Sequence, residues 1–215
     1  MPDVLISNWL YLVTAAGTTI YLSAGSIALS TALGLGAALL KVFGGAPLRF
    51  MVEVYIYVVR GVPLLILLFT MYFVLPYSGV DLPSRLGGVL VIGLYFGAFM
   101  TEVFRAAIAA LPRSQWDAAR SLGMRRPLLL SMIILPQALR LAAPSFVNTC
   151  MMLVKATSIV SFIGVWELTL AGREVVERTL APFQIFGGVA LIYFCICFSL
   201  AQYARRLERR LAHGQ

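Results

Sequence analysis

Long uncharged stretches alternate along the chain with short clusters of basic residues. The first stretch runs from residue 4 to residue 40 without a charged side chain, too long for one straight membrane-spanning helix of about 20 residues. We therefore predict an interfacial segment over residues 1–15 that leads into a first span. The same pattern over the rest of the chain predicts five membrane-spanning helices, at residues 16–41, 53–76, 86–109, 141–166 and 181–204.

Composition supports a membrane protein. Hydrophobic residues make up 60% of the chain, charged residues 12%, and the mean hydropathy is +0.91, which excludes an ordinary soluble domain. The net charge of +8 does not indicate nucleic-acid binding, because the basic residues gather between and after the predicted spans. Most lie between spans one and two, between spans three and four, and after span five, including Arg205–Arg210. The positive-inside rule then places the N-terminus outside and the C-terminus in the cytoplasm.

The longest polar interruption, residues 105–140, holds six arginines and one acidic residue, Asp117. We predict a short helix here, with Ser114 as its N-cap and Asp117 three residues later as in a capping box. Gly123 is placed to end this helix in the left-handed conformation, and Pro127 to start the next one. Small residues and one aromatic residue share a face that fits the groove of a partner protein: Trp116, Ala119 and Gly123, adjoined by Ala118 and Leu122. The alternative is an amphipathic helix lying among the lipid headgroups.

Several ordered motifs resemble one family of transport proteins. The DAA of residues 117–119, Gly123 and the IILP of residues 133–136 have the spacing of the "EAA" loop in the membrane subunits of bacterial ABC importers. RGVPLL (60–65), ILPQALR (134–140) and KATSIVS (155–161) are similar to motifs of its polar amino acid permeases. The resemblance implies an all-α type I importer transmembrane domain over residues 16–211, a cytoplasmic coupling loop at 110–140 and a tail at 212–215.

The resemblance also implies partners. In this family two permeases, identical or homologous, form a dimer in the bacterial inner membrane. Two cytoplasmic ABC ATPase subunits bind ATP and Mg, and an extracytoplasmic solute-binding protein delivers the substrate. The chain contains no phosphate-loop motif, so we expect no catalysis and no cofactor or metal of its own. We expect contact with the ATPase through Ser114, Gln115, Trp116, Asp117, Ala118, Ala119, Arg120, Leu122 and Gly123.

Polar residues within the predicted spans are candidates for the route of an amino acid substrate, because charge inside a membrane is rare and usually functional. The candidates are Glu102, Lys155, Thr157, Ser158, Ser161 and Gln184. Lys155 is placed to pair with a carboxylate, with pairing to Glu102 or Glu167 or a reach toward the interface as alternatives. For Glu102 the alternative is an ion pair with Arg105. Ala156 stands where the family commonly has Asp, which argues against a cationic substrate held by this chain.

Two other functional classes remain open from the residues alone. A self-sufficient secondary carrier is expected to contain inverted repeats and a carboxylate or histidine relay, which we do not find. A membrane scaffold needs neither Lys155 inside a span nor an organised docking helix. The acidic and basic residues of segment 167–178 predict the longest external loop, either a docking surface for a binding protein or an ordinary solvated loop.

Overall fold

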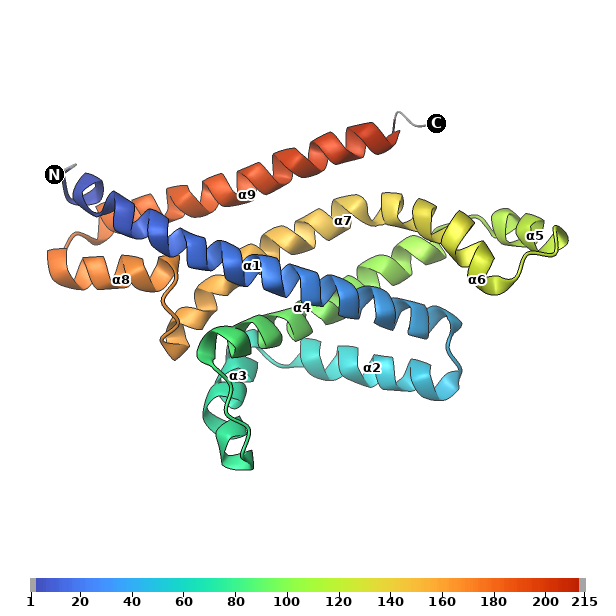
Figure 1. Ribbon diagram of the computed structural model, residues 1–215, viewed down its shortest axis with the longest axis horizontal. Helices are drawn as coiled ribbons and strands as arrows, with labels where there is room; N and C mark the ends of the chain where they lie inside the picture. Colours follow the sequence, from blue (N-terminus) through green and yellow to red (C-terminus); the bar gives the residue numbers. More distant parts are fainter. Residues whose placement is uncertain (1–2, 213–215) are drawn as a thin grey trace.

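The computed structural model describes the backbone of residues 3–212 and the side-chain environments of residues 4–203. All regular structure in this part of the chain is helical, with the elements named in Figure 1. The α-helices are α1 (Asp3–Phe43), α2 (Ala46–Gly61), α3 (Leu64–Phe69), α4 (Ser84–Ala109), α5 (Arg113–Ser121), α6 (Arg126–Leu129), α7 (Leu135–Ala156), α8 (Leu168–Thr179) and α9 (Pro182–Ala212). Two π-helical turns, Thr70–Val74 and Leu130–Ile134, and two 3₁₀ segments, Leu75–Ser78 and Thr157–Ile163, complete the order.

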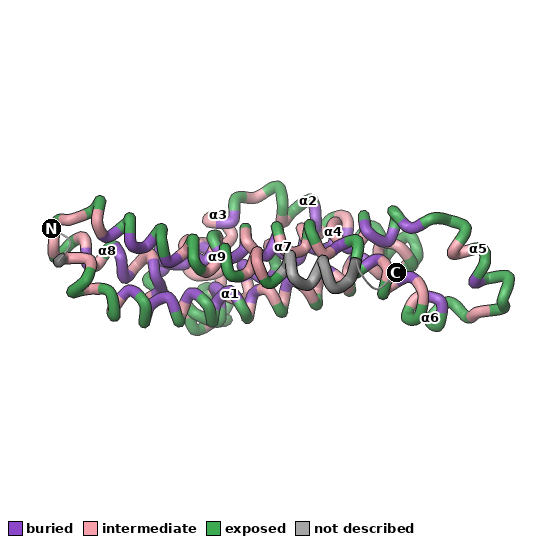
Figure 2. Tube along the Cα trace, turned by 90° about the horizontal axis from the view of Figure 1, so that it is seen from above, coloured by how far each residue is buried: buried purple, intermediate pink, exposed green. Residues whose placement is uncertain are grey.

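The core lies where α1 crosses α4. At Gly34 of α1, an added Cβ would lie 2.3 Å from the Cβ of Met100 on α4, so the two helices touch almost backbone to backbone. Helices α7 and α9 pack beside this pair, and α8 closes one end against α1 and α9. The bundle is long and shallow, with α5 and α6 projecting at the end opposite α8 (Figures 1 and 2).

Four helical segments are long and apolar enough to cross a membrane: Val4–Phe43, Ser84–Ala109, Arg126–Ile163 and Pro182–Tyr203. A bent pair, Ala46–Gly61 with Leu64–Ser78, supplies a fifth if it counts as one span. The predictions for spans three and five are confirmed closely by α4 and α9. Arg205–Arg210, which we interpret from the sequence as an anchor at anionic lipid, and the predicted tail at 212–215 lie outside the residues whose side chains are described.

The predicted second span, 53–76, is wrong as a straight helix. Its two halves meet at an angle of 100°. Val62 is extended (φ −108°, ψ 133°), and α3 begins after Pro63. Proline has no backbone N–H and disfavours the helical conformation in the residue before it, and the chain turns at this point.

The predicted fourth span also begins too late. Helical structure runs from Arg126 to Ile163, and Pro136 and Pro144 lie within it. A π-helical turn at Leu130–Ile134 immediately precedes Pro136, and such a wide turn accommodates the missing hydrogen bond without ending the helix. The helix ends where Gly164 adopts a positive φ of 74°.

Helix α1 is unbroken from residue 3 to residue 43, so the fold marks no boundary between the interfacial segment and the first span at residue 15. At 1.5 Å per residue its 41 residues extend over about 60 Å, roughly twice the hydrocarbon thickness of a bilayer. The division of α1 at residue 15 stays a prediction.

The predicted external loop at 167–178 is wrong as a solvated loop. The segment forms α8, and its first acidic residue, Glu167, is fully buried. Glu174 is partly buried and accepts hydrogen bonds from Tyr11 and from Trp166 Nε1. Glu167 and Glu174 therefore bind α8 to the bundle, whereas Arg173, Glu177 and Arg178 are exposed.

Candidate functional site

Helix α5 is the short exposed helix predicted from the polar interruption, but its N-cap differs. Pro112, with φ −57° and ψ 137°, precedes the first helical residue, Arg113, and its carbonyl accepts a hydrogen bond from the Gln115 N–H at 3.2 Å. No side chain caps the helix. The prediction of Ser114 as N-cap is wrong because Pro112 fixes an extended conformation two residues earlier, which leaves Ser114 inside the first turn.

The C-terminal end of α5 confirms the prediction for Gly123, whose φ is +71°. The Gly123 N–H donates to the Arg120 carbonyl at 2.9 Å, and the Met124 N–H donates to the Ala119 carbonyl at 3.2 Å. This pair of bonds is a Schellman motif. Helix α6 then begins at Arg126 with Pro127 in its first turn, also as predicted. The loop is thus held between two defined helix ends.

One face of α5 is packed against its own chain. Ala119 is only 2% exposed, and it shares a hydrophobic cluster with residues of α4 and α7. The indole of Trp116 lies 5.9 Å from the ring of Phe43 at the end of α1. The predicted docking face placed Trp116 and Ala119 toward a partner, and the burial of Ala119 speaks against this for that residue. Trp116 is half-buried, and its contact with a partner stays a prediction. Their contacts join α5 to the ends of the long helices.

The opposite face of α5 is free. Its exposed residues are Ser114, Asp117, Ala118, Ser121 and Leu122. Leu122 is 79% exposed, and Asp117 forms only a loose 4.0 Å ion pair with Arg120. Gln115 is half-buried, and its side-chain oxygen finds no hydrogen-bond partner among the described residues. The sequence prediction omitted Ser121, although it lies one turn after Asp117 and donates to the Asp117 carbonyl at 3.0 Å.

Close to α5 lies an ion-pair cluster around Glu102 of α4. Glu102 accepts from Lys41 Nζ at 3.0 Å and from Arg105 at 2.8 Å, and Lys41 lies 3.9 Å from Glu53 of α2. The ion-pair alternative for Glu102 is therefore confirmed. Its carboxylate joins α4 to Lys41 of α1, and Lys41 in turn links the cluster to Glu53 of α2. Sequence reasoning found Arg105 from its spacing but missed Lys41 and Glu53. The signal for them is that each lies at the predicted end of a span.

The other candidates for a substrate route lie at the far end of the bundle, where α7 passes into the 3₁₀ segment. Lys155 is exposed and in no ion pair among the described residues, which excludes its predicted pairing with Glu102 or Glu167 there. Thr157, Ser158 and Ser161 each donate to a backbone carbonyl three residues earlier, at 2.7–2.8 Å.

Gln184 does not join this group. Lys155 lies near Cys197 of α9. Gln184 is 13 residues before Cys197 on the same helix, about 20 Å along its axis. The structure thus brings together Lys155 and the three hydroxyl residues, and it leaves Gln184 in the first turn of α9.

These features define a class. Apolar helices of spanning length carry, at one end, an amphipathic helix packed on one side and exposed on the other, so the chain is a multi-pass membrane protein. The model of the family of binding-protein-dependent transport system inner membrane components matches residues 30–213, and the chain belongs to this family. It is therefore a permease-type subunit of an ABC importer.

Individual proteins agree with this assignment. A probable amino-acid ABC transporter permease of Bacillus subtilis, YckA, is 33% identical, with 97% of this chain and 92% of that protein covered. The L-cystine transport system permease TcyB of the same species is 37% identical over 90% of this chain and 83% of its own. The glutamine transport system permease GlnP of Escherichia coli is 32% identical, covering 93% and 92%.

Solved structures match the fold. The crystal structure of an amino acid ABC transporter with histidines has a TM-score of 0.88 at 29% identity and covers 96% of each chain. An inward-facing structure of the MetNI methionine ABC transporter has a TM-score of 0.80 at 17% identity, covering 93% of this chain and 95% of that one. The second shows shared fold alone, which is that of type I ABC importer permeases, as the sequence motifs implied.

Proposed function

We propose that the chain translocates polar amino acids across the bacterial inner membrane as one of two permease subunits, with its N-terminus outside and its C-terminus in the cytoplasm. A pair of ABC ATPase subunits binds ATP and Mg, and an extracytoplasmic binding protein delivers the amino acid. The amino acid names of relatives that cover nearly the whole chain support the substrate class. The excess of basic residues in the segments assigned to the cytoplasm supports the orientation.

The observation that carries the proposal is the two-sided packing of α5. Its inner face is fixed by Trp116 and Ala119, and its outer face presents Ala118 and Leu122 with nothing of this chain upon them. A helix that is anchored on one side and exposes a small and an apolar residue on the other suits the helix-in-groove mode of recognition. We therefore assign the outer face to the ATPase.

The anchored side explains how motion is passed on. A displacement of α5 moves Phe43 at the end of α1 through Trp116, and it moves α4 because only three residues, Ala110–Pro112, separate the two helices. Closure of the ATPase pair on ATP draws the two α5 helices together, and the long helices of the two permeases rotate about a central route. The bundle thereby opens alternately to the two sides of the membrane.

Within that route we assign the substrate carboxylate to Lys155. A lysine within a membrane-spanning segment needs a counter-charge or water, and in the described residues Lys155 has no acidic partner. Thr157 and Ser161 are buried and their hydroxyls donate to backbone carbonyls, whereas Ser158 is partly exposed. Its hydroxyl donates to the Lys155 carbonyl at 2.8 Å, so we assign its oxygen as the acceptor for the ammonium group. The route thus offers one cation and one hydroxyl acceptor for the two ends of an amino acid.

Cross-linking of adjacent alanines tests the docking face. With the partner ATPase present, Ala118→Cys on the exposed side is expected to form an adduct with a cysteine in the ATPase groove, whereas Ala119→Cys on the packed side is expected to form none. Leu122→Asp should abolish ATP-dependent uptake of labelled amino acids in proteoliposomes while leaving the permease folded. Equal adducts at both alanines, or full uptake with Leu122→Asp, contradicts the assignment.

A further inference from the structure

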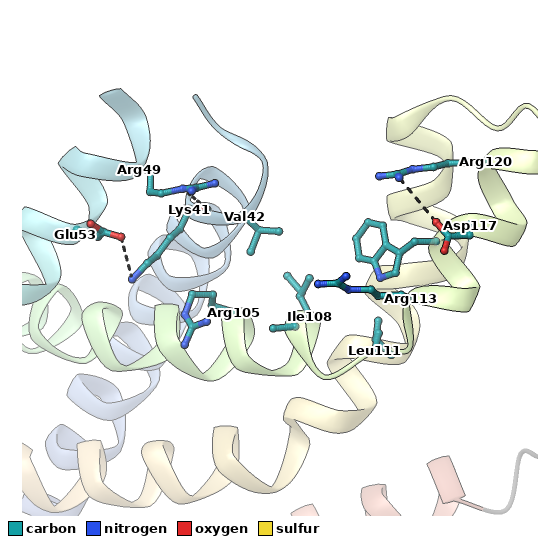
Figure 3. Close-up of a pocket in the computed structure, with 12 residues that line it drawn as sticks. Lys41, Val42, Arg49, Glu53, Arg105, Ile108, Leu111, Arg113, Asp117 and Arg120 are labelled. Carbon is teal, nitrogen blue, oxygen red and sulfur yellow. Dashed lines mark hydrogen bonds and ion pairs between the residues drawn. The ribbon is translucent and has the colours of Figure 1, made fainter. Parts of the chain in front are cut away.

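A cavity of about 690 Å³ lies between α5 and the hairpin formed by α1 and α2. The end of α4 forms its floor, and residues from all four helices line it (Figure 3). Lys41 and Arg49 stand on the hairpin side, and Arg113 stands on the α5 side. Asp117 borders both this cavity and the outer face of α5, whereas Ala118 and Leu122, which we assign to the ATPase, do not line the cavity.

The cavity is strongly basic. Its five cationic residues are Lys41, Arg49, Arg105, Arg113 and Arg120. The carboxylates opposite them are those of Glu53, Asp117 and Glu102, the last pairing with two of the cations, so five positive charges face three negative ones. Arg49 and Arg113 take part in no ion pair within the described part of the chain, and Arg49 Nε donates only to the Lys41 carbonyl at 3.2 Å. Two guanidinium groups are thus available to an anion.

An apolar groove of about 470 Å³ begins beside this cavity, between the same two helices. Ala37 lines the groove and Lys41, one turn later on α1, lines the cavity; Val52 and Arg49 have the same relation on α2. At Gly36 an added Cβ would meet no atom within 4 Å, so the groove is open there. A cationic end therefore continues into an apolar channel.

We propose that the cavity and groove together bind one anionic phospholipid, with its phosphate between Arg49 and Arg113 and one acyl chain along the groove. Arginine forks bind phosphate oxygens in pairs, and basic clusters beside membrane helices attract anionic headgroups. An acidic peptide from a partner would account for the cations but would leave the apolar groove unused. The assignment to the inner leaflet rests on the proposed function, which places this end of the bundle in the cytoplasm.

Such a lipid has a structural consequence. Arg49 belongs to α2 and Arg113 belongs to the first turn of α5, so a phosphate held by both would tie α5 to the α1–α2 hairpin. The position of α5 would then depend on the lipid. Anionic lipid is expected to raise the ATP turnover that is linked to transport, whereas a lipid with no net charge is not.

Native mass spectrometry of the purified full chain tests the binding without any need for transport. We compare the fraction of protein that retains phosphatidylglycerol with the fraction that retains phosphatidylcholine. A basic residue near an anionic membrane contributes about fivefold in affinity, so the double substitution Arg49→Gln with Arg113→Gln should weaken phosphatidylglycerol binding about 30-fold. Arg125→Gln is the matched control, because Arg125 is an exposed arginine of the same loop that lines neither space. It should leave binding unchanged.

Two further measurements distinguish a lipid phosphate from a free anion. Gly36→Leu places a larger side chain, and a better helix former, in the groove and should weaken phosphatidylglycerol binding. Competition by millimolar inorganic phosphate should be unchanged in this variant. If Gly36→Leu has no effect and inorganic phosphate displaces the lipid fully, the cavity is a site for free anions and the proposal fails. It also fails if the double arginine variant binds phosphatidylglycerol normally but loses the ATPase, since the cations then belong to a protein interface. Loss of amino acid uptake with normal lipid binding would instead refute only the proposed function.

Discussion

The buried carboxylate of Glu167 allows a quantitative test of how α8 is fixed to the bundle. One of its oxygens accepts hydrogen bonds from the Thr169 and Leu170 N–H groups at 2.9 and 3.0 Å, which caps α8. The other accepts from the Tyr193 hydroxyl at 2.9 Å and, at 3.4 Å, from Thr19. Since Thr19 belongs to α1 and Tyr193 to α9, this single side chain joins three helices.

Glu167→Ala should therefore be strongly destabilising. Loss of an N-cap costs about 1 kcal/mol, and a buried donor left without a partner costs about 1–3 kcal/mol. The Tyr193 hydroxyl keeps a contact with Thr169 Oγ1 at 3.1 Å, which limits the free-energy cost of losing Glu167 as its partner. We expect a total loss of about 3 kcal/mol. Glu167→Gln retains an acceptor for the cap and a polar partner for Tyr193, so its loss should stay near 1 kcal/mol.

Glu167 also makes stability depend on pH. Burial raises the pKa of its carboxyl above the usual value, against the lowering effect of the hydrogen bonds from Thr169, Leu170 and Tyr193. The folded protein thus binds a proton that the unfolded chain has already released, and stability falls as pH rises from the usual glutamate pKa to the raised one. Below that window the group imposes no penalty, and above it the penalty is constant. In Glu167→Gln this slope should be absent.

Thermal unfolding in detergent at several pH values is the suitable measurement. For a chain of this size a loss of 3 kcal/mol lowers Tm by about 10 °C. Glu177→Ala is the control on the same helix, because Glu177 is exposed and should change stability by less than about 0.5 kcal/mol. If Glu167→Ala unfolds at the wild-type temperature, or if Glu167→Gln keeps the wild-type pH slope, the carboxylate does not hold α8 as described.

Three shorter predictions follow from other contacts. Gly34→Ala should destabilise by about 1–3 kcal/mol, because its Cβ would meet Met100 at 2.3 Å, whereas Gly36→Ala meets nothing within 4 Å and should be neutral or slightly stabilising in the same unfolding assay. Gly123→Ala forces a Cβ into a φ of +71° and should cost about 1 kcal/mol, seen as faster hydrogen exchange confined to the end of α5. Lys155→Met should raise the KM for amino acid uptake at least tenfold with ATPase docking unchanged, and an unaltered KM would remove Lys155 from the route.

The parts of the fold that the sequence predicted are those set by local chemistry. Long apolar stretches identified α4 and α9, and Gly123 and Pro127 marked the helix ends in the loop between α4 and α7. Each of these signals acts within a few residues of the chain. A left-handed cap at Gly123 needs only a residue without a side chain, whatever lies beyond it.

The errors arose where distant parts of the chain decide the outcome. The sequence predicts Glu167 as a loop residue because a carboxylate without partners prefers water. Hydrogen bonds from Thr19, 148 residues away, and from Tyr193 on another helix offset the cost of burying it. The bend at Pro63 could have been predicted locally, because proline is a signal for a break in a helix. Pro136 is the same signal, yet the helix continues through it because a π-helical turn precedes it.

Ala118 and Ala119 show why the docking face could not be predicted. They are adjacent, identical in chemistry and helix propensity, and 100° apart around α5. Ala119 is buried only because the ends of α4 and α7 lie beneath it and Trp116 finds Phe43 of α1 on the same side. Hydrophobic periodicity shows that a helix has two faces. It does not show which face contacts the rest of the chain and which contacts a partner protein. In this protein the aromatic side of α5 packs on its own bundle, and Ala118 and the exposed Leu122 lie on the side that we propose for the ATPase.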